Sequence, residues 1–132
     1  MSWSADLSLV EPDGLGNGCH WVSLWVMIRM NISEADWKVY KRIRDLAQDR
    51  YSQRVLDDAG GICQDESMPV QDRHAELSRL LRERDKEMFQ IFDRLRRSSA
   101  VLCLMMMRRY ELVTDEEMGS FSPELRRGSE IP

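Results

Sequence analysis

The sequence predicts an all-α fold built on a helical hairpin, and three observations support this. Apolar residues recur every three or four positions over two long windows. Neither glycine nor proline occurs between Pro69 and Gly119, and charged residues, 32% of the chain, fill the positions between the apolar ones. A chain of 132 residues has room for one domain. We expect residues 31–132 to form it, preceded by a poorly patterned arm over residues 1–30.

Residues 1–30 lack the helical pattern of the rest. The stretch "EPDGLGNG" is typical of a loop, and "CHWVSLWVMI" follows it with Trp21 and Trp25 in an apolar patch. A third interpretation, contact of this patch with a membrane surface, lacks the basic face that such elements need. Two others stay open. Either this arm packs on the body, or the natural start codon encodes Met27 or Met30 and the preceding residues are over-called upstream sequence.

The first helix is expected over residues 34–59. Ser33 is a favourable N-cap, and Ile32 with Trp37 has the spacing of a hydrophobic staple. Gly60–Gly61 is expected to end the helix. The apolar stripe between these signals comprises Trp37, Tyr40, Ile43, Ala47, Tyr51 and Val55.

The second helix is expected to be one long helix over about 68–113. Ser67 is the expected N-cap, with Pro69 in the first turn. Such a helix would be roughly 65–70 Å long, whereas the first helix would cover about 39 Å of it. Part of its seam would therefore lack a partner within the chain. The seam comprises Leu77, Leu81, Met88, Ile91, Leu95, Leu102, Met105 and Leu112.

Two solutions would cover the exposed part of the seam. The helix can stay continuous and pair with a second copy, giving a dimeric helical bundle with packing of the coiled-coil type. Alternatively, it breaks near Ser98 and folds back as a three-helix bundle. We expect the continuous helix, because no acidic residue stands at the N3 position after Ser98 or Ser99.

Short helices are expected at the carboxyl end. Thr114 and Glu117 have the spacing of a capping box, and Gly119 is expected to end the turn of helix that they start. Ser122–Pro123 is a second helix start, because serine caps and proline suits the first helical position.

The apolar run "AVLCLMMM" over residues 100–107 is predicted to be core or interface and not a membrane span. Its eight residues fall well short of the roughly 20 that a span requires. The acidic start of the chain does not resemble a signal peptide. Three widely spaced cysteines, Cys19, Cys63 and Cys103, suit reduced thiols. We therefore expect a cytoplasmic protein without membrane contact.

The charge pattern disfavours nucleic acid as the main partner. The net charge is −4, and residues 31–60 and 61–97 each carry equal numbers of acidic and basic side chains. Acidic side chains interleaved with the basic ones repel phosphates.

No metal, cofactor or catalytic group is expected. His74 lies in "QDRHAEL", but the sequence lacks the downstream Pro-Cys-x-x-Cys of the zinc deaminases. Cys63 and Asp72 could join His74, yet no fourth ligand follows at a recognisable spacing. Neither histidine follows a glutamate at the spacing of a di-iron site. Ser98 and Ser99 have no histidine base nearby in sequence.

The predicted function is that of a non-enzymatic helical protein that binds other proteins or regulates them, with self-association as the expected mode. Two alternatives remain: a nucleic-acid-associated helical protein, and a small helical enzyme of unknown reaction. The surface predicted to mediate binding comprises Phe89, Phe92, Leu95, Leu102, Met105 and Met106.

Overall fold

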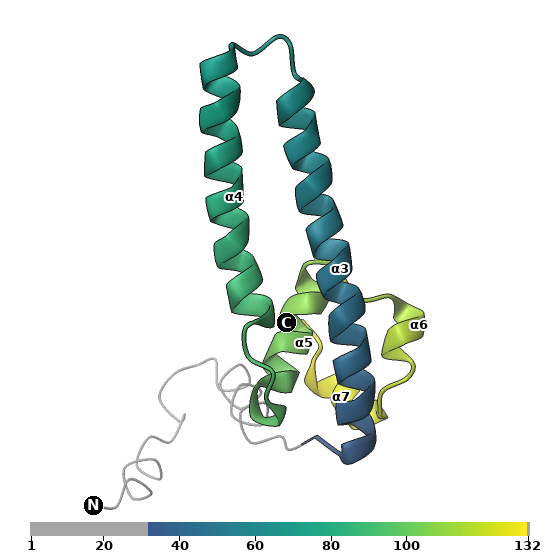
Figure 1. Cartoon of the computed structure of the whole chain (residues 1–132). Coiled ribbons are helices and arrows are strands. Elements are labelled where there is room, and N and C mark those ends of the chain that lie inside the picture. Colours follow the sequence, from purple (N-terminus) through teal and green to yellow (C-terminus); the bar gives the residue numbers. More distant parts are fainter. Residues whose placement is uncertain (1–31, 132) are drawn as a thin grey trace, which may run out of the picture.

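Two long antiparallel helices form a hairpin, α3 over Glu34–Gln64 and α4 over Val70–Phe92. This computed structural model describes residues 32–131, so both interpretations of residues 1–30 lie outside the described residues. Figure 1 shows the hairpin projecting beyond the helices that follow it. The predicted all-α hairpin with short carboxyl-terminal helices is confirmed, and residues 32–131 contain no strand. The later elements are the short 3₁₀ helix η2 (Arg97–Ser99), α5 (Ala100–Arg109), α6 (Asp115–Met118) and α7 (Pro123–Gly128).

The amino terminus of α3 has the predicted cap. The Ser33 hydroxyl accepts a hydrogen bond from the Asp36 backbone N–H at 3.1 Å. Ile32 is buried, and Trp37 packs against the same core. The buried Asp36 carboxylate accepts hydrogen bonds from the Ser122 backbone N–H at 2.9 Å and from its hydroxyl at 2.6 Å. This carboxylate therefore joins the first turn of α3 to the N-cap of α7.

Helix α3 does not end at Gly60–Gly61, so that predicted boundary is wrong. The helix continues through both glycines to Gln64. A glycine in a helix costs about 1 kcal/mol relative to alanine, and contact with α4 offsets this cost. Arg73 of α4 donates a hydrogen bond to the Cys63 carbonyl at 3.0 Å, which satisfies a carbonyl of the last turn.

The predicted Ser67 cap of the second helix is also wrong. Pro69 occupies the N-cap position of α4, and no side chain caps this helix. The backbone N–H of Ser67 instead donates to the Asp65 carboxylate at 3.1 Å. Aspartate and serine often form such local turns, and here the turn competes with the cap.

The predicted continuous helix over about 68–113 is wrong. Helix α4 ends at Phe92, residues 93–96 are not helical, and η2 then leads into α5. The interruption matches the alternative of a bundle broken near Ser98. Ser99 stands at the N-cap of α5 without capping it, because its hydroxyl donates to the Arg96 carbonyl at 3.2 Å.

Burial within the chain explains why the apolar run turns back. If α4 continued straight, the apolar side chains of residues 100–107 would have no neighbour within the chain. Their exposure to water would cost a free energy of about 25 cal/mol per Å² of apolar surface. Arg44 of α3 also donates a hydrogen bond to the Phe92 carbonyl, which satisfies an acceptor at the end of α4. The side chains that α5 buries are Ala100, Val101, Cys103, Leu104 and Met107.

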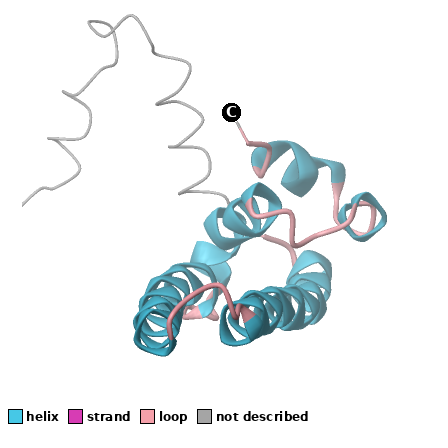
Figure 2. Cartoon of the chain, turned by 90° about the horizontal axis from the view of Figure 1, so that it is seen from above, coloured by secondary structure: helices cyan, strands magenta, loops and turns pink. Residues whose placement is uncertain are grey.

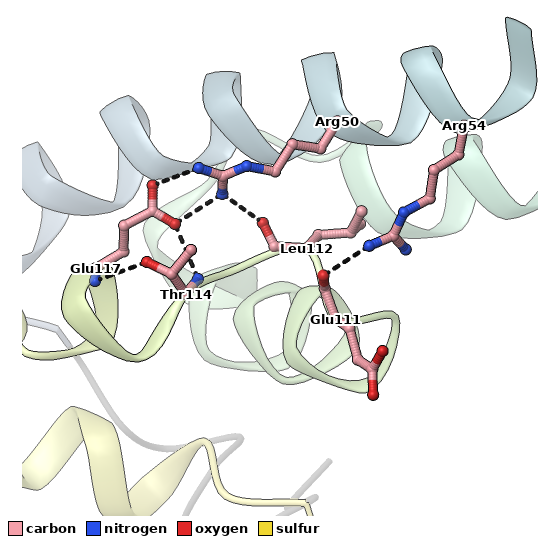
Figure 3. A network of polar contacts seen from close by, with 6 residues as sticks. All are labelled: Arg50, Arg54, Glu111, Leu112, Thr114 and Glu117. Carbon is pink, nitrogen blue, oxygen red and sulfur yellow. Dashed lines mark hydrogen bonds and ion pairs between the residues drawn. The ribbon is translucent and has the colours of Figure 1, made fainter. Parts of the chain in front are cut away.

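The predicted capping box at α6 is confirmed, and α3 holds it in place. The Thr114 hydroxyl accepts from the Glu117 N–H at 3.1 Å, and the Glu117 carboxylate accepts from the Thr114 N–H at 2.9 Å. Arg50 of α3 pairs with both oxygens of this carboxylate, at 2.7 and 2.9 Å, and also donates to the Leu112 carbonyl (Figure 3). The predicted start of α7 at Ser122–Pro123 is likewise confirmed.

A second arginine of α3 supports the turn after α5. Arg54 donates to the Tyr110 carbonyl at 2.6 Å. It also donates to the Glu111 carbonyl at 2.8 Å (Figure 3). Glu111 has a φ of 56°, in the left-handed region that side chains other than glycine rarely adopt. The hydrogen bonds that Arg54 donates to these two carbonyls help to hold the backbone of Glu111 in this conformation.

The core lies at the base of the hairpin. Figure 2 shows the carboxyl-terminal helices on one side of α3 and α4. Beyond this base, among the described residues, α3 and α4 have only each other as neighbours (Figure 1). The core side chains include Tyr40, Ile43, Ala47, Ile91, Leu104, Met107, Leu112 and Leu125.

Candidate interaction surface

The six side chains predicted to form one binding surface have different environments. Phe92 is only 2% exposed and belongs to the core, so it is not available to a partner. Leu95 in the connection and Leu102 on α5 are about half exposed, at 51% and 52%. Met105 and Met106 pack partly against the core. Phe89 is 64% exposed.

Phe89 and Leu102 do not share a face. Glu87 lines a cleft together with Tyr110, which follows α5, so Glu87 points towards the α5 side of α4. Phe89 lies two residues further along α4, about 200° around a helix with 3.6 residues per turn. The Phe89 side chain therefore points away from the α5 side. The predicted surface divides into at least two separate parts.

The projecting part of the hairpin has a feature that the sequence did not predict. We call residues 52–90 the distal hairpin; none of their side chains is buried. The apolar side chains between the two helices are half-buried and not fully buried, among them Val55, Leu77, Leu80 and Met88. Two helices alone thus shield their apolar stripes only in part.

Among the uncovered sides of the distal hairpin, one carries large apolar side chains, and we call Leu56, Leu81 and Phe89 its bare face. Their exposed fractions are 65%, 41% and 64%. Arg54 and Asp58 of α3 line the same cleft as Glu87. Leu56 lies two residues from each of them, about 200° around the helix, so its side chain points away from the cleft. Large apolar side chains gathered on one exposed side mark a candidate contact surface.

Leu56 and Leu81 lie at about the same height along the hairpin. Tyr51 and Asp58 of α3 both contact Arg84 of α4, through the Arg84 carbonyl at 3.1 Å and its guanidinium at 2.7 Å. Leu56 lies between these two contacts on α3, and Leu81 lies one turn before Arg84 on α4. Leu81 belongs to the predicted seam of the second helix and Leu56 flanks the predicted stripe of the first, so neither leucine was predicted as part of the binding surface.

A polar cleft of about 390 Å³ lies where the distal hairpin meets the base. Both arginines of the cleft have partners within the chain: Arg84 pairs with the Asp58 carboxylate, and Arg54 donates to the carbonyls after α5. The Tyr51 hydroxyl donates to the Arg84 carbonyl and to the Glu87 carboxylate at 3.3 Å. The cleft residues are Tyr51, Arg54, Asp57, Asp58, Arg84, Glu87 and Tyr110.

The chemistry of this cleft does not favour catalysis. Burial and the Glu87 carboxylate raise the pKa of Tyr51 to about 12, so its phenol is neutral at physiological pH. A neutral phenol that already donates its proton to a carbonyl and a carboxylate is a poor base or nucleophile.

Within residues 32–131, no three or more His, Cys, Asp or Glu side chains lie close enough together to hold a metal ion. Cys63 is an exposed free thiol, whereas Cys103 is a buried one. His74 is exposed on α4. None of the described helices combines the length and the apolar character that crossing a bilayer requires.

The basic residues of α4 are partly neutralised on the helix itself. Arg79 pairs with Glu76 and, at 2.9 Å, with Glu83. Carboxylates beside guanidinium groups weaken attraction to phosphate backbones.

Comparison with protein-family models, with curated proteins and with solved structures gives no match to this chain.

Proposed function

We propose that this chain is a non-enzymatic interaction protein that acts through the bare face of its distal hairpin and pairs there with a second copy of itself. The observation that supports this is the absence of any buried side chain over residues 52–90. Helices of this kind gain most of their stability by burying an apolar stripe against other elements. A second layer of helices over the bare face would complete that burial.

The side of the distal hairpin that carries the bare face is large enough for a stable contact. The part of α4 within the distal hairpin has a length of about 30 Å, and two neighbouring helices are about 20 Å wide. One copy would therefore contribute about 600 Å², and two copies about 1,200 Å² in total, the lower end of stable protein interfaces.

The geometry of the bare face suits a second copy as the partner. Residues 52–90 carry nine acidic and six basic side chains, so the contact must depend on apolar burial, and added salt is expected to strengthen it by screening the repulsion between two copies. Leu56 and Leu81 lie at similar heights, which suits a twofold arrangement in which each leucine pair contacts the other. The product would be a four-helix bundle made of two hairpins.

A cytoplasmic location belongs to the same proposal. Cys63 is exposed and Cys103 is buried, and both are free thiols. Unpaired thiols, one of them open to solvent, suit a reducing compartment.

The molar mass of the full chain in solution tests the proposal. Light scattering over a dilution series into the tens of micromolar is expected to give twice the chain mass of 15.5 kDa. Leu56→Glu places a charge in the proposed contact, and we expect the mass to fall to that of one chain. A monomer at the highest concentration of the unchanged protein would overturn the proposal.

Leu102→Glu is the matched control. Leu102 is also a half-exposed leucine on a helix, but it lies on α5, outside the bare face. We expect this variant to keep the mass of a dimer. If both variants dissociate, or only Leu102→Glu does, the contact lies elsewhere and the assignment to the distal hairpin is wrong.

A further inference from the structure

A second cleft lies among α5, α6 and α7, away from the bare face of the distal hairpin. Its volume is about 510 Å³. Two apolar side chains, Met118 and Pro123, and four charged ones line it. The charged residues are Arg108, Arg126, Arg127 and Glu130.

The charges of this cleft sum to a positive value, whereas those of the cleft beside Tyr51 sum to a negative one. Three guanidinium groups face one carboxylate, which leaves two positive charges. Within residues 32–131, none of these three arginines lies within ion-pair distance of a carboxylate. By contrast, Arg84 in the first cleft pairs with Asp58 at 2.7 Å. Like charges gathered around one concave site favour an anion from solution.

Neutral acceptors hold two of the three guanidinium groups in position. Arg108 donates to the Arg126 carbonyl and to the Ser129 hydroxyl oxygen, both at 2.9 Å. Ser129 is fully buried, so this acceptor is fixed. Arg127 donates through Nε to the Pro123 carbonyl at 3.4 Å. These contacts orient the arginines and leave their positive charges in place.

We propose that this cleft binds a phosphate monoester. The dianion matches the two uncompensated positive charges, and guanidinium groups bind phosphate oxygens through paired hydrogen bonds. Met118 and Pro123 provide an apolar wall for the organic part of the ester. The volume of the cleft accommodates a small molecule of this kind.

Calorimetric titration of the full chain at about pH 8, where both probes are dianions, and at low salt tests the site with inorganic phosphate and phenyl phosphate. Both are expected to bind, because both carry the dianion. Phenyl phosphate is expected to bind several-fold more tightly, because its ring can contact Met118 and Pro123. Equal affinities would exclude the apolar wall, and absence of binding by both probes would overturn the whole proposal.

Three charge variants locate the binding. Arg127→Gln removes an exposed guanidinium and is expected to weaken phenyl phosphate binding at least fivefold. Glu130→Gln removes the opposing carboxylate and is expected to strengthen binding several-fold. Arg82→Gln, at an exposed arginine of α4, is the control and is expected to leave the affinity unchanged. Unchanged affinity in Arg127→Gln, or equal losses in Arg127→Gln and Arg82→Gln, would overturn the site.

Discussion

The carboxylate of Glu117 joins two distant parts of the chain, and its titration gives a test at the scale of one residue. The hydrogen bonds from Arg50, followed by those from Thr114, lower its pKa from 4.5 to about 2. Because the pKa is lower in the folded state, this contribution to stability is present above pH 4.5 and disappears as the pH falls towards 2.

Glu117→Gln should therefore lower the free energy of unfolding at neutral pH by about 1–2 kcal/mol, since the Arg50 partner is partly exposed and solvent screens the pair. Urea denaturation at a series of pH values measures the difference between the two proteins. The difference is expected to shrink as the pH falls below 4.5. Glu116→Gln, at an exposed neighbour, is the control. A difference that stays constant with pH would contradict the assigned cause.

Single residues were predictable where their partners lie close in sequence. The Ser33 cap, the Thr114–Glu117 box and the Ser122–Pro123 start each depend on atoms within one helical turn. The hydrogen bond from Arg44 to the Phe92 carbonyl spans 48 residues. No local pattern distinguishes this arginine from the solvated ones around it.

At the scale of the helices, Gly60 and Gly61 test whether α3 truly continues to Gln64. A methyl group added at either glycine would meet nothing within 4 Å. Alanine also restricts the unfolded chain and suits a helix, so each Gly→Ala change should stabilise the protein by about 0.5–1 kcal/mol. Thermal denaturation followed by circular dichroism measures this effect. A loss of stability would show that the helix ends at these glycines.

The return of α5 onto the hairpin makes a second prediction, which compares two leucines of one helix. Leu104 is fully buried, so Leu104→Ala should cost about 2–5 kcal/mol through lost burial and the cavity left behind. Leu102 is half exposed, so Leu102→Ala should change stability by much less. Urea denaturation of both variants measures the loss in the free energy of unfolding. Similar losses for the two would indicate that α5 does not pack on α3 and α4 as described.

The break between α4 and α5 was harder to predict than the helices themselves. Ser98 and Ser99 lack the acidic partner of a capping box, and Ser99 indeed makes no capping bond. The turn depends instead on burial of Leu104, Met107 and their neighbours against α3. Periodicity identifies such residues as apolar, but it does not say whether their partner lies in the same chain or in another.

At the scale of the whole molecule, stability is unevenly distributed. The buried side chains gather at the base of the hairpin, whereas residues 52–90 have none. From the sequence, self-association was inferred from one helix longer than its partner. In the structure, the proposal depends instead on the distal hairpin, in which two helices project beyond the base. The candidate surface could not be predicted from the sequence, because Leu81 has the same spacing as core residues and Leu56 lies directly beside the stripe of core residues on α3.

This uneven distribution predicts how the amides exchange hydrogen. In a monomer, residues 52–90 should open locally with a smaller free energy than α5, because few apolar contacts hold them. Dimerisation through the bare face would protect the distal hairpin, so its exchange should slow as protein concentration rises while exchange in α5 stays unchanged. Mass spectrometry at two concentrations measures both regions in one experiment, and Leu56→Glu should abolish the concentration dependence. Slow, concentration-independent exchange over residues 52–90 would mean that two helices suffice and that the hairpin needs no partner.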